Sequence, residues 1–212
     1  LDNVSDLMLA VVGGALRVGT PFLFVSLGEC LTEKSGRINL GLEGVLVFSA
    51  MAAFGGAYLT GSPWLGVLAA CFCGALLAML HGLLCSLPRV SDIATGIALM
   101  LLGAGLAFYL GKQLIQPQAP QIPSLPLGAW SSSPAVQTAL SVNALFPIGV
   151  LLAGLLAWGF KNTRWGLVVR MAGDSSDAAR ALGYSVNGVR IAATMVGGAI
   201  AGFGGASLSL YY

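Results

Sequence analysis

The chain has 212 residues, of which 57% are hydrophobic and only 8% are charged, with a formal net charge of +2. Soluble domains carry about 25% charged residues, so this composition excludes an ordinary soluble protein. The ten basic residues are scattered rather than gathered into one stripe, which excludes nucleic acid as a partner.

The apolar residues fall into six blocks, each long enough to cross a bilayer, which takes about 20 helical residues. The predicted spans are, in chain order, Leu7–Leu31, Leu40–Leu59, Trp64–Leu87, Ile93–Leu110, Ala144–Phe160 and Ile191–Tyr212. Charged, turn-forming or proline-rich segments separate them. The sequence therefore predicts an all-α fold, a polytopic transmembrane helical bundle in which residues 1–212 form a single domain in the lipid bilayer.

Arg17 lies near the middle of the first predicted span, where a basic residue costs about 2.5 to 3.5 kcal/mol. Its side chain should therefore face protein or water rather than lipid. Three interpretations remain open. Arg17 donates hydrogen bonds to a polar substrate, it forms an internal ion pair, or it precedes a shorter span that begins at Val18.

The segment SGRINLGLEG, residues 35–44, interrupts the apolar pattern after the first span. Gly36, Gly41 and Gly44 weaken a helix, and Asn39 and Glu43 bring polar groups to the end of a span. This combination is typical of broken helices that line a substrate pathway. It also fits a helix start, with Asn39 as a cap and Glu43 at the favourable N-terminal end. The two interpretations are compatible.

The sequence predicts no metal site, no catalytic residue and no cofactor. Cys71 and Cys73, two residues apart, point in nearly opposite directions on a helix. His81 has no second histidine or carboxylate at ligand spacing, so we expect a buried, hydrogen-bonded histidine. The absence of a nucleophile paired with a base, or of a phosphate-binding glycine loop, argues against an intramembrane enzyme.

The longest charged break between spans covers residues 161–190 and contains GDSSDAARALG at 173–183. This segment predicts a helix of about two turns. Asp174 or Ser175 can cap its N-terminus, and Gly183 can end it in the left-handed conformation.

That short helix is predicted to be amphipathic. Asp177 and Arg180, three residues apart, can form an ion pair on its polar side together with Ser176. The apolar side consists of Ala178, Ala179, Ala181 and Leu182. It needs another surface to cover it.

Basic residues lie in alternate connections of the predicted bundle. Lys112 alone falls on one side, and eight fall on the other: Lys34, Arg37, Arg89, Lys161, Arg164, Arg170, Arg180 and Arg190. The positive-inside rule makes the second side cytoplasmic. It places the N-terminus and the proline-rich loop from Gln113 to Asn143 outside, where the prolines favour an extended cover.

Two segments resemble a known family. TEKSGRINLGLEGVLVFSA, residues 32–50, resembles the signature of bacterial ABC importer permeases of the nucleoside and simple-sugar group. VVRMAGDSSDAARALGYSVNGVRIAATMVGGAIAGFGGA, residues 168–206, is similar to the cytoplasmic coupling loop of that group and the span after it. Family members usually continue through further spans, so a C-terminally incomplete domain is one interpretation of this chain.

The resemblance implies a permease subunit of the bacterial inner membrane that forms a translocation pathway for nucleosides or simple sugars and hydrolyses no ATP itself. It implies three protein partners: an ABC ATP-binding subunit, a second permease subunit and an extracytoplasmic substrate-binding protein. An ion-gradient-driven secondary transporter or channel for a small polar solute is the alternative. A carboxylate deep in a span would favour that alternative, and the only candidate is Glu43, at a span end.

The resemblance also assigns residues to roles. The pathway residues are Asn39, Gly41, Glu43 and Gly44, with Arg17 added by its position. The residues expected to couple the chain to the ATP-binding subunit are Gly173, Asp174, Ala178, Ala179, Leu182 and Gly183. Glycines in the sixth span predict a smooth helix that packs closely among others, within the chain or against a second permease subunit, and these are Gly197, Gly198, Gly202, Gly204 and Gly205.

Overall fold

The computed structural model describes residues 2–114 and 118–211. Within these ranges, six helices are long and apolar enough to cross a membrane: α1 (Asp2–Lys34), α2 (Leu42–Thr60), α3 (Pro63–Leu84), α4 (Asp92–Gly111), α6 (Leu145–Asn162) and α9 (Val186–Tyr211). Each overlaps one predicted span, so the predicted bundle is confirmed. The predicted outer loop includes residues 115–117 and the last predicted span includes Tyr212, and these positions lie outside the described residues.

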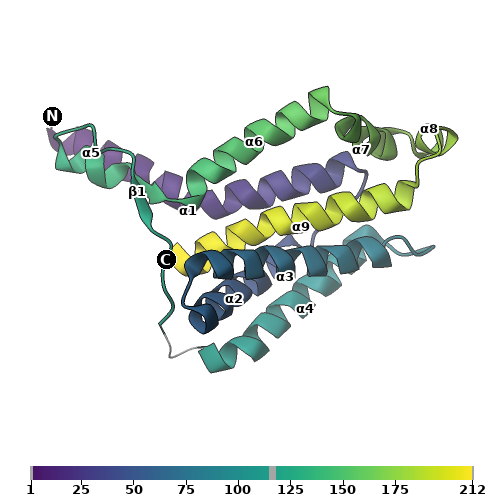
Figure 1. Ribbon diagram of the computed structural model, residues 1–212, viewed down its shortest axis with the longest axis horizontal. Helices are drawn as coiled ribbons and strands as arrows, with labels where there is room; N and C mark the ends of the chain where they lie inside the picture. Colours follow the sequence, from purple (N-terminus) through teal and green to yellow (C-terminus); the bar gives the residue numbers. More distant parts are fainter. Residues whose placement is uncertain (1, 115–117, 212) are drawn as a thin grey trace.

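The spans alternate in direction, so the connections collect at two ends of the bundle (Figure 1). One end, the α8 end, holds residues 35–41 and 85–91 together with α7 (Arg164–Asp174) and α8 (Ser176–Ala181). The other, the α5 end, holds the elements between α4 and α6, which are η1 (Lys112–Leu114), β1 (Ser124–Pro126), α5 (Pro134–Ala139) and β2 (Ser141–Asn143). The eight basic residues counted above lie towards the α8 end, and Lys112 lies at the α5 end.

Helix α9 is the centre of the bundle. In its most apolar window 61% of the residues are buried, against 11% to 39% in the other five spans. A Cβ atom added at Gly202 would lie 2.6 Å from the Ala70 carbonyl oxygen of α3, and one at Gly205 would lie 2.7 Å from the Leu46 carbonyl oxygen of α2. The glycine face of α9 is therefore buried within this chain, and it is not a face left for a second subunit.

The outward faces of the outer helices are apolar. Large side chains such as Phe72 of α3, Leu101 of α4 and Leu151 of α6 are more than half exposed. Soluble monomers rarely expose apolar patches of this extent. These faces fit the hydrocarbon core of a bilayer.

The proline-rich loop is more structured than the extended cover predicted from its composition. Strands β1 and β2 pair antiparallel, and α5 lies along the first half of α1 (Figure 1). The loop is tied to the end of α9 because the Ile122 amide donates to the Leu210 carbonyl (2.9 Å) and the Asn143 amide group donates to Ser207 Oγ (2.9 Å). The last two side chains are buried, so this contact orders the loop on the α5 end of the bundle.

Candidate functional site

The helices α7 and α8 have ends that are fixed by capping hydrogen bonds. Thr163 Oγ1 accepts the Gly166 amide (3.0 Å) at the start of α7. Ser175 donates its amide to the Met171 carbonyl (2.9 Å) to end α7, and its Oγ accepts the Ala178 amide (3.4 Å) to begin α8. Of the two caps predicted, the structure therefore selects Ser175, and Asp174 is the last residue of α7. Gly183 has φ +85°, which confirms the predicted left-handed end.

The predicted ion pair of α8 is present and exposed. Arg180 Nη1 lies 2.9 Å from Asp177 Oδ1, and both side chains remain largely in solvent. Such a pair contributes about 0 to 1 kcal/mol. It supports the helix without anchoring it.

The predicted apolar side of α8 divides into an inner and an outer part. Ala179 is fully buried with Ala172 of α7 and Val186 of α9. Leu182 is 64% exposed, and Ala178, Ala181 and Tyr184 are exposed as well. Ala179 therefore holds α8 against its own chain. The outer part, together with the exposed Tyr184 that follows the helix, forms what we call the α8 surface: Ala178, Ala181, Leu182 and Tyr184.

Gly173 lies where α7 meets the loop after α1. A Cβ atom on Gly36, which has φ +86°, would lie 2.9 Å from Gly173 Cα. A side chain on Gly173 would in turn overlap the Lys34 carbonyl oxygen. Glycine is required at both positions, because the two backbones touch.

Arg190, in the first turns of α9, joins the same two segments. Its Nε donates to the Ser35 carbonyl (3.1 Å), and its Nη2 donates to the Ala172 carbonyl (2.8 Å). The sequence pattern did not predict this role. The available signal was an arginine at the start of an apolar span directly after the charged break.

Residues 35–41 form a tightly bonded loop at the α8 end. Arg37 Nη1 lies 2.8 Å from Asp92 Oδ1, and the two side chains are only 9% and 22% exposed. Asn39 is 2% exposed. Its side-chain Oδ1 accepts the Gly41 amide (2.9 Å), and its backbone amide donates to Glu29 Oε1 (2.9 Å). Arg37, Asp92 and Glu29 were not predicted as site residues.

Glu29 corrects the expectation that Glu43 is the only carboxylate relevant to a span. Glu29 lies inside α1, two residues before the predicted end of the first span, and its Oε2 is buried with no hydrogen-bond partner among the described residues. Glu43 is exposed in the first turn of α2.

Gly41 and Gly44 lie against α4. A Cβ atom on Gly41 would lie 2.9 Å from the Gly96 carbonyl oxygen, and one on Gly44 would lie 2.6 Å from Met100 Cα. The structure thus gives both glycines a packing role between α2 and α4. The residue that caps α2 is Gly41, and Asn39 supports it from two positions earlier.

Arg17 lies apart from these residues. Its Nε donates to the Gly13 carbonyl (3.2 Å) and its Nη2 donates to the Thr138 carbonyl of α5 (3.4 Å). The 33 residues of α1 extend about 50 Å, and about 20 residues counted back from Lys34 reach Ala15. Arg17 therefore lies near the α5-end limit of the bilayer core, where it holds α5, and no ion pair joins it to the described side chains.

His81 and Cys85 lie one turn apart at the α8 end of α3. His81 is fully buried, as predicted, and its Nε2 lies 3.6 Å from Cys85 Sγ. This pair fills the end of α3 rather than forming a reactive site.

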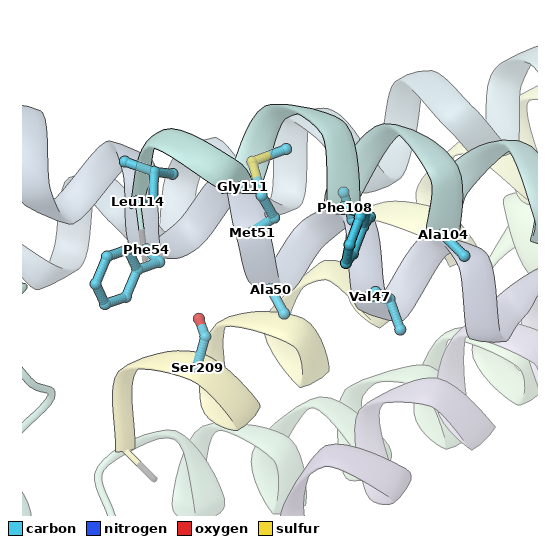
Figure 2. Close-up of a pocket in the computed structure, with 10 residues that line it drawn as sticks. Val47, Ala50, Met51, Phe54, Ala104, Phe108, Gly111, Leu114 and Ser209 are labelled. Carbon is cyan, nitrogen blue, oxygen red and sulfur yellow. The ribbon is translucent and has the colours of Figure 1, made fainter. Parts of the chain in front are cut away.

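A pocket of about 400 Å³ lies between α2, α4 and α9 (Figure 2). Its walls are apolar apart from the Ser209 hydroxyl, and they include Met51 and Phe54 of α2 and Phe108 of α4. A pocket with one polar group fits an apolar occupant better than a sugar or a nucleoside.

The fold and these contacts define a polytopic membrane protein whose spans are bonded, at one end, to a structured loop with an exposed apolar surface. The family model of the branched-chain amino acid transport system permease component matches residues 11–212. The chain belongs to that family.

Three relatives carry more specific names. The putative glucose ABC transporter permease protein TsgC13 of Haloferax volcanii is 30% identical over 207 residues, which cover 95% of this chain and 63% of the relative. The nucleoside ABC transporter permease protein NupC of Lactococcus lactis is 29% identical, and the guanosine ABC transporter permease protein NupQ of Bacillus subtilis is 26% identical. Both alignments cover 96% of this chain and 68% of the relative. The chain thus spans about two thirds of the length of these relatives. No solved structure matches it.

Proposed function

We propose that this chain is the membrane-spanning permease subunit of an ATP-driven ABC importer and forms part of the translocation pathway for a nucleoside or a simple sugar. The names of three relatives support this class of transporter and these two substrate groups. In this proposal the α8 end is cytoplasmic and the N-terminus lies outside the inner membrane, because eight basic residues lie towards the α8 end and only Lys112 and Arg17 lie towards the α5 end.

The observation that carries the proposal is the α8 surface. Leu182 is 64% exposed at the tip of a capped helix, and Ala179, next to it on the same apolar side, is buried against α7 and α9. A helix that is anchored by part of its apolar side and exposes the rest can insert that exposed part into a groove of a partner. We assign that groove to the ATP-binding subunit. A second permease subunit and an extracytoplasmic substrate-binding protein complete the assembly.

Leu182→Glu tests this assignment. Burying a leucine contributes roughly 1.5 to 3 kcal/mol, and a carboxylate at the same place adds a desolvation cost. We expect the variant to lose most of the co-purifying ATP-binding subunit, or to lose uptake while the chain remains in the membrane. Arg180→Ala, on the polar side of α8, removes only the exposed pair and is the matched control. If Leu182→Glu assembles and transports like the parent, α8 is a solvated connector.

One observation bears on the ion-driven alternative, and it is Glu29. Its Oε1 accepts the Asn39 amide and thereby orders the loop after α1, which is a structural task. The two classes differ in energy source. Uptake by the reconstituted complex should require ATP and persist with a protonophore, and uptake driven by an imposed ion gradient without ATP would instead support the alternative.

A further inference from the structure

We propose that Arg190 is the positioning residue that links the α8 surface to the α1–α2 loop, so that motion of α8 reaches α4. This inference rests on the proposed function. It concerns a residue of α9 that lies in neither of the two segments, α7–α8 and 35–44, that carry the expected roles.

The two carbonyl groups that accept hydrogen bonds from Arg190 belong to different segments, α7 and the α1–α2 loop. Ala172 lies in the last turn of α7, where backbone carbonyls have no partner within the helix. Ser35 lies in the turn after α1 and is fully buried. A guanidinium group is planar and rigid, so its two donors, at 2.8 and 3.1 Å, fix the separation of the two carbonyls.

Beside Arg190, the backbones of Gly36 and Gly173 are in direct contact, so α7 and the α1–α2 loop have no free space between them. A Cβ atom on Gly36 would lie 2.9 Å from Gly173 Cα and 3.0 Å from Arg190 Nη2. When α7 moves, the loop at Gly36 must therefore move with it or separate from Arg190.

The path continues from each side of Arg190. On one side, Ala179 of α8 is buried with Ala172. On the other, the loop holds α4 through the Arg37–Asp92 pair at 2.8 Å and through the Ile38 amide, which donates to Asp92 Oδ2 at 3.4 Å. Asp92 is the first residue of α4. The contacts therefore run without interruption from α8 to the start of a membrane span.

The test compares Arg190→Met and Arg190→Lys in the complete reconstituted complex, with ATP hydrolysis, uptake and co-purification of the ATP-binding subunit measured together. Methionine removes both donors and lysine keeps the charge without the rigid fork. Loss of one hydrogen bond from a charged donor changes an equilibrium constant by about tenfold or more. We therefore expect uptake per ATP hydrolysed to fall about tenfold or more in Arg190→Met. Uptake per ATP hydrolysed by Arg190→Lys should lie between the values of the parent and of Arg190→Met. Arg89→Met, at an exposed position at the same end, is the control.

A second variant disturbs the same contact without replacing Arg190. Gly36→Ala should lower uptake per ATP because the added methyl group forces the loop away from Gly173. Gly61→Ala is its control, because Gly61 also has positive φ (+68°) but has no atom within 4 Å of the added Cβ. Both variants thus place an alanine at a positive φ, and they differ in that only the Gly36→Ala methyl group meets neighbouring atoms.

The outcomes are distinguishable. Unchanged uptake per ATP in Arg190→Met and Gly36→Ala would overturn the inference, and so would a parallel fall of hydrolysis and uptake that merely follows loss of the ATP-binding subunit. If the parent complex shows no ATP-dependent uptake at all, the proposed function itself fails and the inference fails with it.

Discussion

Residues 35–44 show how polar side chains near a span divide between structure and solvent. Asn39 is buried. Its side-chain oxygen accepts the Gly41 amide, and its backbone amide donates to Glu29 Oε1. Glu43, four residues later, is exposed in the first turn of α2, where a carboxylate also favours the helix. Of the two polar residues in this segment that are expected to line a pathway, Glu43 is therefore the one whose side chain is free to meet a solute.

Glu43→Gln follows from this division. The substitution keeps the shape of the side chain and removes its charge, so a pathway role predicts reduced uptake with normal insertion of the protein. Glu33→Gln, an exposed glutamate in the last turn of α1, is the control. Uptake and membrane levels are measured in the same cells. Equal uptake in Glu43→Gln and the parent would leave Glu43 only its place at the helix start.

At the scale of elements, α9 is stabilised by backbone approach rather than by large side chains. Gly198 faces Gly74 and Ala78 of α3, and a Cβ atom on Gly198 would lie 2.5 Å from the Gly74 carbonyl oxygen. Close approach through small residues is how helices associate where lipid removes the hydrophobic driving force between them. The glycines of α9 therefore set the distances between α1, α2, α3 and α9.

Gly198→Ala and Gly154→Ala should have effects of opposite sign. The first inserts a methyl group into a filled contact, and overpacking of this kind costs about 1 to 3 kcal/mol. The second places a methyl group in open space on α6, where alanine favours the helix by up to about 1 kcal/mol over glycine. Thermal unfolding of the purified protein in detergent measures both. A Gly198→Ala variant as stable as Gly154→Ala would contradict the tight packing of α9.

At the scale of the whole molecule, the arrangement has two chemically different ends. The α8 end carries eight of the basic residues and the loop with the apolar α8 surface, whereas the α5 end carries an ordered cover of two strands and a short helix (Figure 1). By the positive-inside rule, this asymmetry supports the proposed orientation, in which the α8 end faces the cytoplasm.

Labelling of single cysteines tests this orientation. Cys30, Cys71, Cys73 and Cys85 are first replaced. One cysteine is then placed at Ser132, in the loop at the α5 end, or at Asn187, near the start of α9, and both positions are exposed. A membrane-impermeant maleimide added to intact cells should label only position 132, and position 187 should react after permeabilisation. The reverse pattern would invert the topology.

The sequence by itself determined the number and the approximate limits of the spans. An apolar block of about 20 residues must cross the bilayer as a helix, because no water is present there to bond a free backbone, and this is a property of each block alone. Local rules also predicted a cap at Asp174 or Ser175, the left-handed Gly183 and the Asp177–Arg180 pair, since each depends on residues within one or two turns.

Only the tertiary structure decided which distant groups meet. Arg190 with Ser35 and Ala172, and Arg37 with Asp92, join residues that no local pattern relates. Leu182 and Ala179 have the same apolar character, but one is exposed and the other buried, because burial depends on where α7 and α9 pass. In a bundle whose helices are apolar on most sides, the pattern along one helix does not specify its neighbours. Glycine contacts and a few buried polar groups specify them, and these appear only when the helices are assembled.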